Sequence, residues 1–152
     1  MATTTHSKFK QEINSFDGSD QSLKRSFTDP VFATDGDIVQ CFALGRGVLI
    51  KNLCVRLTDW DGGSSLAWRA HITDGSTTHV IIASQTTVGQ SAGFVRAGDT
   101  IANAPGLFFV TTSNLWRIEL EVLTTAGTPV TSGTIEVVLT IGGHRNSGDI
   151  TE

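Results

Sequence analysis

From Ile38 onward, apolar and polar residues alternate with the period of two that is typical of half-buried β-strands. The clearest run covers residues 116–122. Its apolar parity holds Trp116, Ile118, Leu120 and Val122, and its polar parity holds Arg117, Glu119 and Glu121. A second run has Ile135, Val137, Leu139 and Ile141 on one parity and Glu136, Val138 and Thr140 on the other. We expect two neighbouring antiparallel strands, each with one wet face, whose apolar side chains form facing parts of one core.

Two further runs lie nearer the start of this region. They cover Ile38–Leu44 and Val48–Thr58, and the intervening Gly45-Arg46-Gly47 fits a three-residue hairpin loop. In the second run the apolar parity changes at Lys51-Asn52, which predicts a β-bulge. Such a hairpin sets Cys41 opposite Lys51 and Cys54 opposite Ile38, so we expect two separate, buried or half-buried thiols rather than a disulfide.

A second hairpin is predicted around the Asp74-Gly75 turn, between alternating residues 66–73 and the apolar run 79–83. His71 and His79 stand symmetrically about this turn, and we expect an exposed cross-strand pair rather than a zinc site, because two histidines are too few for one. Residues 85–106 are rich in glycine, with one short strand expected near Phe94-Val95, and another strand is expected at 107–110. Several short strands without a helical stretch indicate two packed sheets or a barrel.

The first 37 residues have a different pattern, polar with isolated apolar positions. Phe9, Ile13 and Phe16 follow helical spacing between a possible N-cap at Ser7 and a stop at Gly18, which predicts one short amphipathic helix. A helix this short is marginal alone in water, so we expect it to be ordered only by docking on a neighbouring subunit or on the shell of a larger assembly. Leu23 and Phe27 continue the apolar spacing. The alternative is that the arm folds back and covers an edge strand of its own domain, through Phe27, Val31 and Phe32.

These patterns divide the chain into an N-terminal arm (1–37), a β-sandwich domain (38–143) and a polar C-terminal tail (144–152). The fold class that we predict is all-β, with an antiparallel sandwich behind an extended arm. The net charge is −4 and the 11 basic residues are scattered, so nucleic acid is not an expected partner. The chain starts without a basic segment followed by an apolar run, and it has no apolar stretch of bilayer length, so we expect no membrane partner and a protein that is made and kept in a cytoplasm.

Three motifs suggest chemistry and are better explained without it. Gly89-Gln90-Ser91-Ala92-Gly93 matches a nucleophile elbow but lacks the helix that must follow the serine. Asp59-Trp60-Asp61-Gly62-Gly63 resembles a calcium loop, but Ala70 stands where its closing Glu belongs, so a solvated turn is favoured. Glu119, Glu121 and Glu136 fall on the outward parity, as a wet sheet face requires. We therefore expect no enzyme activity, cofactor or metal, and no small-molecule ligand. Trp60 itself is either an interface anchor or a core residue.

Several segments resemble small virion proteins of tailed phages. They are the polar start Met1-Ala2-Thr3-Thr4, the connection from Phe42 to Ile50, the turn Ile72-Thr73-Asp74-Gly75 and the closing strand from Gly133 to Leu139. Within that group the layout is similar to the decoration, or cement, proteins of the capsid surface. The resemblance implies a jelly-roll-like sandwich, often trimeric, that binds between capsomers. The arm before Asp37 is longer than in the shortest members.

The leading hypothesis is therefore a capsid decoration protein on the virion surface, with the major capsid protein and copies of itself in a homotrimer as partners. Its predicted interface residues are Phe9, Ile13, Phe16, Leu23, Phe27 and Trp60. One alternative is a tail, head-completion or fibre-base component of the virion. Another, from a different class, is a carbohydrate-binding module, suggested by Trp60 on a loop with acidic, glycine-rich turns.

Overall fold

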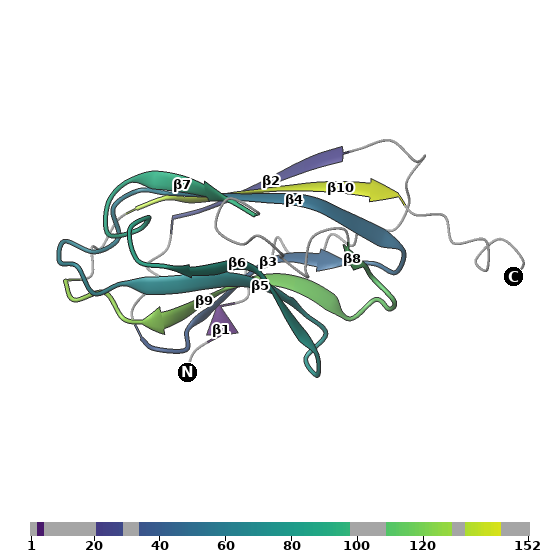
Figure 1. Ribbon diagram of the computed structural model, residues 1–152, viewed down its shortest axis with the longest axis horizontal. Coiled ribbons are helices and arrows are strands. Elements are labelled where there is room, and N and C mark those ends of the chain that lie inside the picture. The colour runs from purple at the N-terminus through teal and green to yellow at the C-terminus, as the bar shows by residue number, and fades with distance from the viewer. Residues whose placement is uncertain (1–2, 5–20, 29–33, 98–108, 129–132, 144–152) are drawn as a thin grey trace, which may run out of the picture.

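The alternating runs form two sheets that pack face to face, as the computed structural model of residues 3–4, 21–28, 34–97, 109–128 and 133–143 shows (Figure 1). The first sheet has the spatial order β1 (Thr3–Thr4), β3 (Ile38–Leu44), β9 (Trp116–Thr124), β5 (Ala67–Thr73), β6 (Thr78–Gln85). The second has the order β2 (Gln21–Phe27), β10 (Ile135–Gly143), β4 (Val48–Leu57), β7 (Gly93–Arg96), and β8 (Phe109–Val110) pairs with the start of β4. Only the short β1–β3 pair is parallel among these strands. The predicted all-β, jelly-roll-like antiparallel sandwich is confirmed.

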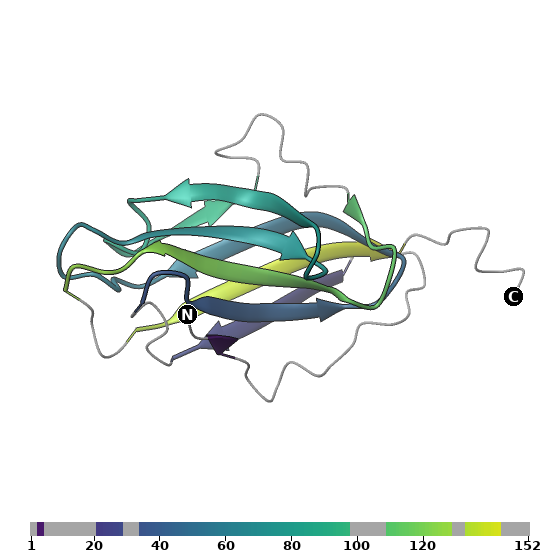
Figure 2. The ribbon, with the colours of Figure 1, turned by 90° about the horizontal axis from the view of Figure 1, so that it is seen from below.

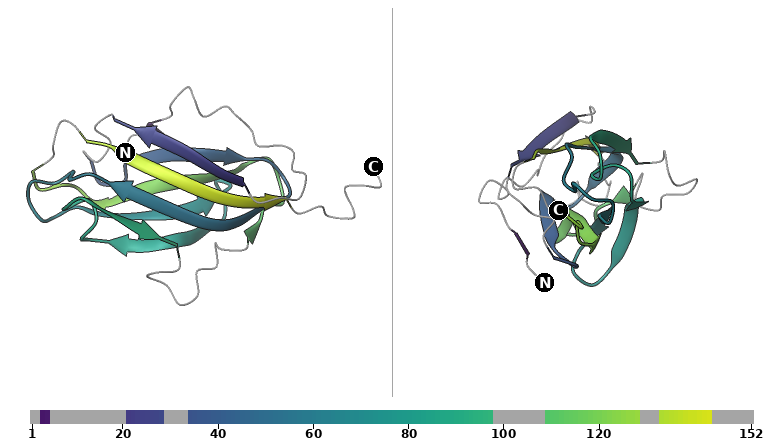
Figure 3. Two further views of the ribbon diagram at one scale, coloured as in Figure 1. Left: turned by 90° about the horizontal axis from the view of Figure 1, so that it is seen from above. Right: turned by 90° about the vertical axis from the view of Figure 1, so that its left-hand side faces the viewer.

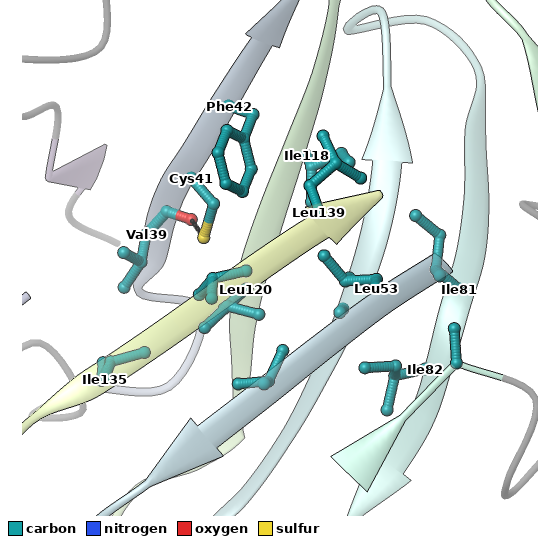
Figure 4. Close-up of a cluster of buried hydrophobic side chains, with 14 of the residues drawn as sticks. Val39, Cys41, Phe42, Leu53, Ile81, Ile82, Ile118, Leu120, Ile135 and Leu139 are labelled. Atoms are coloured by element: carbon teal, nitrogen blue, oxygen red, sulfur yellow. Dashed lines mark hydrogen bonds between the residues drawn. The ribbon is translucent and has the colours of Figure 1, made fainter. Parts of the chain in front are cut away.

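The chain crosses repeatedly between the two layers, and the strands of both run roughly along the long axis of the molecule (Figure 2). The core fills the space between the layers, where side chains from β3, β4, β6, β9 and β10 meet (Figure 4). Every residue on the apolar parity of the two clearest alternating runs is buried there: Trp116, Ile118, Leu120, Val122, Ile135, Val137, Leu139 and Ile141. The parity assignment is therefore confirmed for both strands.

The strand neighbours, by contrast, were predicted wrongly for this pair. β9 lies between β3 and β5 in the first sheet, and β10 lies between β2 and β4 in the second. The two strands face each other across the core instead of sharing hydrogen bonds. Alternation of apolar and polar residues shows which side of a strand is buried. It does not show whether two such strands are neighbours in one sheet or face each other from two sheets.

The Gly45-Arg46-Gly47 segment is not a hairpin loop, because β3 and β4 belong to different sheets. Gly47 does adopt the left-handed conformation, with φ of 78°. The buried Thr111 stabilises this crossing: its hydroxyl donates to the Gly45 carbonyl (2.5 Å) and accepts from the Val48 amide (2.8 Å). Cys41 and Cys54 are consequently on separate sheets, and they are free thiols, buried and half-buried respectively, as predicted.

The bulge predicted in β4 is present. Asn52 pairs with Thr140 and Ile50 pairs with Ile141, so Lys51 is the extra residue. The bulge turns the apolar parity, which lets Ile50 and Leu53 both point into the core.

The β5–β6 hairpin is also confirmed, but its histidines do not form an exposed pair. The turn contains four residues, 74–77, so His79 lies opposite Ile72 and His71 lies opposite Val80. His79 stacks on Trp116, with ring centroids 5.9 Å apart, while His71 is buried on the other face of the sheet. A register different by one residue reverses the face on which a side chain lies.

Part of the predicted arm is a strand of the sandwich. β2 pairs with β10 from Gln21 to Phe27, and the Phe27 side chain is buried in the core. The alternative in which the arm covers an edge strand therefore holds for residues 21–27. The predicted helix around Phe9, Ile13 and Phe16 and the tail 144–152 lie outside the described residues.

Candidate functional site

The outer face of the second sheet carries a hollow built from three adjacent strands. The register sets Glu136 of β10, Arg56 of β4 and Phe94 of β7 in one row. The next row contains Val138, Cys54 and Arg96. Because neighbouring residues such as Val55 and Val95 point into the core, these six side chains point outward.

This hollow has a volume of about 560 Å³ and mixes apolar with cationic side chains. Phe94 is 60% exposed, which is unusual for an aromatic residue in the middle of a short strand. The Arg96 guanidinium lies over its ring, 5.7 Å from the centroid. Val138 and Cys54 provide the apolar floor. A large apolar side chain next to charged groups on a solvated face is typical of an interaction surface.

The charges around the hollow do not cancel. The Glu136 carboxylate is 2.6 Å from the Lys24 ammonium, so these two side chains form an ion pair. Neither Arg56 nor Arg96 has a carboxylate within ion-pair distance in the part of the chain that the structure describes. The hollow is therefore locally positive on a chain whose formal net charge is −4.

The outer face of the first sheet is different, because its charged groups are partnered with each other. The Glu119 carboxylate accepts hydrogen bonds from the Arg117 Nε (2.6 Å), the His71 Nε2 (3.1 Å) and the Gln40 amide (3.2 Å). Burial alone would raise the pKa of Glu119, but the hydrogen bonds from His71 and Arg117 outweigh it and lower that pKa. The prediction that Glu119 lies in solvent is thus wrong: it is 3% exposed. Long neighbouring side chains cover it.

His71 also lies beside a second carboxylate, that of Glu121. Its Nδ1 is 3.4 Å from Glu121 but forms no hydrogen bond among the described residues, and the Glu121 carboxylate accepts from the Arg69 Nε at 2.7 Å. The network joins β3, β5 and β9 through carboxylates that already accept hydrogen bonds from side chains of the chain itself. This network is therefore a weaker candidate than the hollow for binding another molecule.

Asp61 organises one end of the sandwich. Its carboxylate is buried and accepts four backbone N–H groups, from Gly63, Ser65 and Leu66 at 2.8 Å and from Thr128 at 2.9 Å. Burial would raise the pKa of Asp61, but these bonds lower it well below its ordinary value. The turn at residues 59–63 was predicted to be solvated, but its Asp61 carboxylate is buried and joins two loops.

The six predicted interface residues have different locations. Phe9, Ile13 and Phe16 lie outside the described residues, Leu23 is half-buried in β2, and Phe27 is a core residue. Trp60 is 1% exposed and packs beside Gly133, so it cannot anchor a partner. Of the two predicted roles for Trp60, the core position is confirmed. The carbohydrate-binding alternative therefore loses the exposed aromatic residue on which it was based.

The remaining chemical motifs are occupied by structural contacts. The Ser91 hydroxyl donates to the Thr87 carbonyl, and β7 rather than a helix follows it. Among the described residues, no group of three His, Cys, Asp or Glu side chains is arranged to bind a metal ion, and no helix is long and apolar enough to cross a membrane.

The hollow was not predicted from the sequence. A signal existed in Phe94-Val95-Arg96, because a strand whose Val95 faces inward must expose Phe94 and Arg96 on one side. The contribution of Arg56 and Glu136 depends on which strands are neighbours, which alternation does not reveal.

Comparisons with known proteins identify the fold. No protein-family model and no curated protein matches the chain. A chain in the capsid of Ralstonia phage GP4 is similar with a TM-score of 0.68 and 18% identity, over 88% of this chain and 90% of that one. A chain in the capsid asymmetric unit of cyanophage Pam1 is similar with a TM-score of 0.62 and 16% identity, over 93% of this chain and 91% of that one. At these identities the likeness concerns the fold, and it is a fold that makes up nearly the whole of a chain in two phage capsids.

Proposed function

We propose that this chain is a phage virion structural protein, and specifically a capsid decoration, or cement, protein. The observation that supports it is the end-to-end match of the sandwich to chains of two phage capsids. Each match covers about nine-tenths of both compared chains, so their lengths are similar. The likeness is therefore not to one domain of a much larger protein.

The proposed mechanism is mechanical and involves no catalytic turnover. Copies of the sandwich bind the outer surface of the shell, where each one bridges neighbouring major capsid subunits. A specific interface usually buries about 1,200–2,000 Å² in total, and that surface must be exposed again before the bridged subunits separate. The decoration protein therefore stabilises the shell against expansion and rupture. In this proposal the copies associate as homotrimers.

Reconstitution tests this function. Purified protein is added to capsids that lack it, and the particles are recovered by sedimentation, heated to find the rupture temperature, and analysed for the number of copies bound. We expect saturable binding in many copies spread over the shell and a higher rupture temperature. Binding as a single ring at one vertex would indicate a head-completion or tail component instead, and absence of binding to any capsid form would refute the proposal.

A further inference from the structure

We propose that the hollow around Phe94 binds the Phe16–Asp20 segment of a second copy of this chain. This inference rests on the proposed structural role and specifies how copies of the chain associate.

The receiving surface selects for an acidic segment with one large apolar residue. Phe94 is 60% exposed above an apolar floor, so it offers contact area to an incoming ring or aliphatic side chain. Arg56 and Arg96 flank it without a carboxylate partner in the described part of the chain. Guanidinium groups bind carboxylates in a two-pronged geometry, which gives such a contact direction as well as attraction.

The sequence Phe16-Asp17-Gly18-Ser19-Asp20 has this chemistry. It presents one aromatic residue followed by two carboxylates, separated by two small residues. The earlier part of the arm contains Lys8, Lys10 and a single carboxylate, Glu12, so its charge is net positive and the same two arginines would repel it. The complementary charges therefore select residues 16–20 within the arm.

Residues 16–20 join the sandwich too far from the hollow of their own chain to reach it easily. The segment joins β2 at Gln21, which pairs with Ile141. Phe94 lies in the row of paired residues that starts at Ser26, which is five residues further along β2. Five residues along β2 and three strand spacings across the sheet separate Gln21 from Phe94 by about 22 Å. Five extended residues from Gln21 back to Phe16 span at most about 18 Å. Only a taut diagonal path would bring Phe16 near its own Phe94, while the arm of a second copy has no such restriction.

The strand that follows the donor segment and the strand that carries the acceptor lie at opposite edges of the second sheet. β2 forms one edge and β7 forms the other, as the end-on view in Figure 3 shows. A contact between two different patches is head-to-tail, and such contacts close into rings when the rotation per subunit fits. A homotrimer is one such ring.

Charge reversal in the full-length chain tests this contact. The acceptor variant is Arg56→Glu/Arg96→Glu, the donor variant is Asp17→Arg/Asp20→Arg, and a third variant combines all four changes. Lys8→Glu/Lys10→Glu is the matched control, because it changes the net charge as much as the acceptor variant does. Self-association is measured by sedimentation velocity over a concentration series at low salt, and circular dichroism confirms that each variant is folded.

We expect the acceptor and donor variants each to weaken self-association at least about tenfold, which corresponds to roughly 1.4 kcal/mol. The combined variant should regain most of the wild-type association, and the lysine control should match the wild type. A monomeric wild type, donor or acceptor variants that associate normally, or no recovery in the combined variant would each overturn the inference. Capsid binding of the same variants is measured separately. A wild type that self-associates through this contact but binds no capsid would refute the decoration role while leaving this contact intact.

Discussion

Replacing Asp61 with asparagine tests whether a buried carboxylate holds the loop end of the sandwich together. One carboxylate oxygen accepts from the Gly63 and Thr128 amides, and the other accepts from Ser65 and Leu66. In Asp61→Asn an NH₂ group replaces one of these oxygens, so two backbone donors lose their acceptor and face another donor.

The expected cost follows from those two lost bonds. Hydrogen bonds to charged groups contribute about 1.5–3 kcal/mol each, so Asp61→Asn should lower the free energy of unfolding by about 3 kcal/mol or more at pH 7. For a domain of this size that corresponds to a melting temperature lower by roughly 6–12 °C. Urea unfolding followed by tryptophan fluorescence measures the free energy directly.

The Asp61 carboxylate should also make the stability of the folded protein depend on pH. Because the pKa of Asp61 is lowered in the folded state, its stabilisation is fully present above the unfolded-state pKa of about 3.9 and is lost as the pH falls from there toward the folded pKa. The difference in stability between wild type and Asp61→Asn should therefore shrink below about pH 4. Asp59→Asn is the control, because Asp59 is exposed and, among the described residues, its carboxylate accepts a single hydrogen bond, from the Asp61 amide. An Asp61→Asn variant within about 0.5 kcal/mol of wild type, or a difference independent of pH, would refute this account.

Three further predictions concern the core and the arm. Trp116→Ala should cost about 3–5 kcal/mol in urea unfolding, and a cost below about 0.5 kcal/mol would contradict its buried position. Burial raises the pKa of the Cys41 thiol, so a thiol reagent at pH 8 should label Cys54 in the native protein and Cys41 only after denaturation; equal rates would be inconsistent with the fold. Deleting residues 1–20 should change the melting temperature little, whereas deleting 1–36 removes β2 and should lower it by more than about 5 °C; equal effects would contradict the pairing of β2 with β10.

The sequence predicted local properties of the fold well. Alternation identified the inward residues of β9 and β10, and the parity change at Lys51 identified a real bulge. These features depend on residues close together in the chain, because a strand buries one parity whatever strand lies beside it.

The errors concern relations between distant segments. β3 and β4 are consecutive, and the glycines between them predict a hairpin, yet they pair with β9 and β10 respectively. Whether Glu119 is buried likewise depends on Gln40, which is 79 residues away, and on His71. The hollow around Phe94 also needs three strands from distant parts of the chain. Such contacts are decided by the packing of the whole sandwich, which a periodic pattern does not encode.

The position of β10 between β2 and β4 determines when the second sheet can form. β2 is complete at Phe27, but the strand that it pairs with begins only at Ile135. On the ribosome, β2 therefore waits for more than a hundred further residues to be synthesised, and the edge of β4 that pairs with β10 waits for more than seventy. Strand pairing at such sequence separation is slow, and unpaired edges in the waiting chain can pair with those of neighbouring nascent chains. The lysine and arginine side chains of β2, Lys24 and Arg25, oppose that misassociation until β10 emerges.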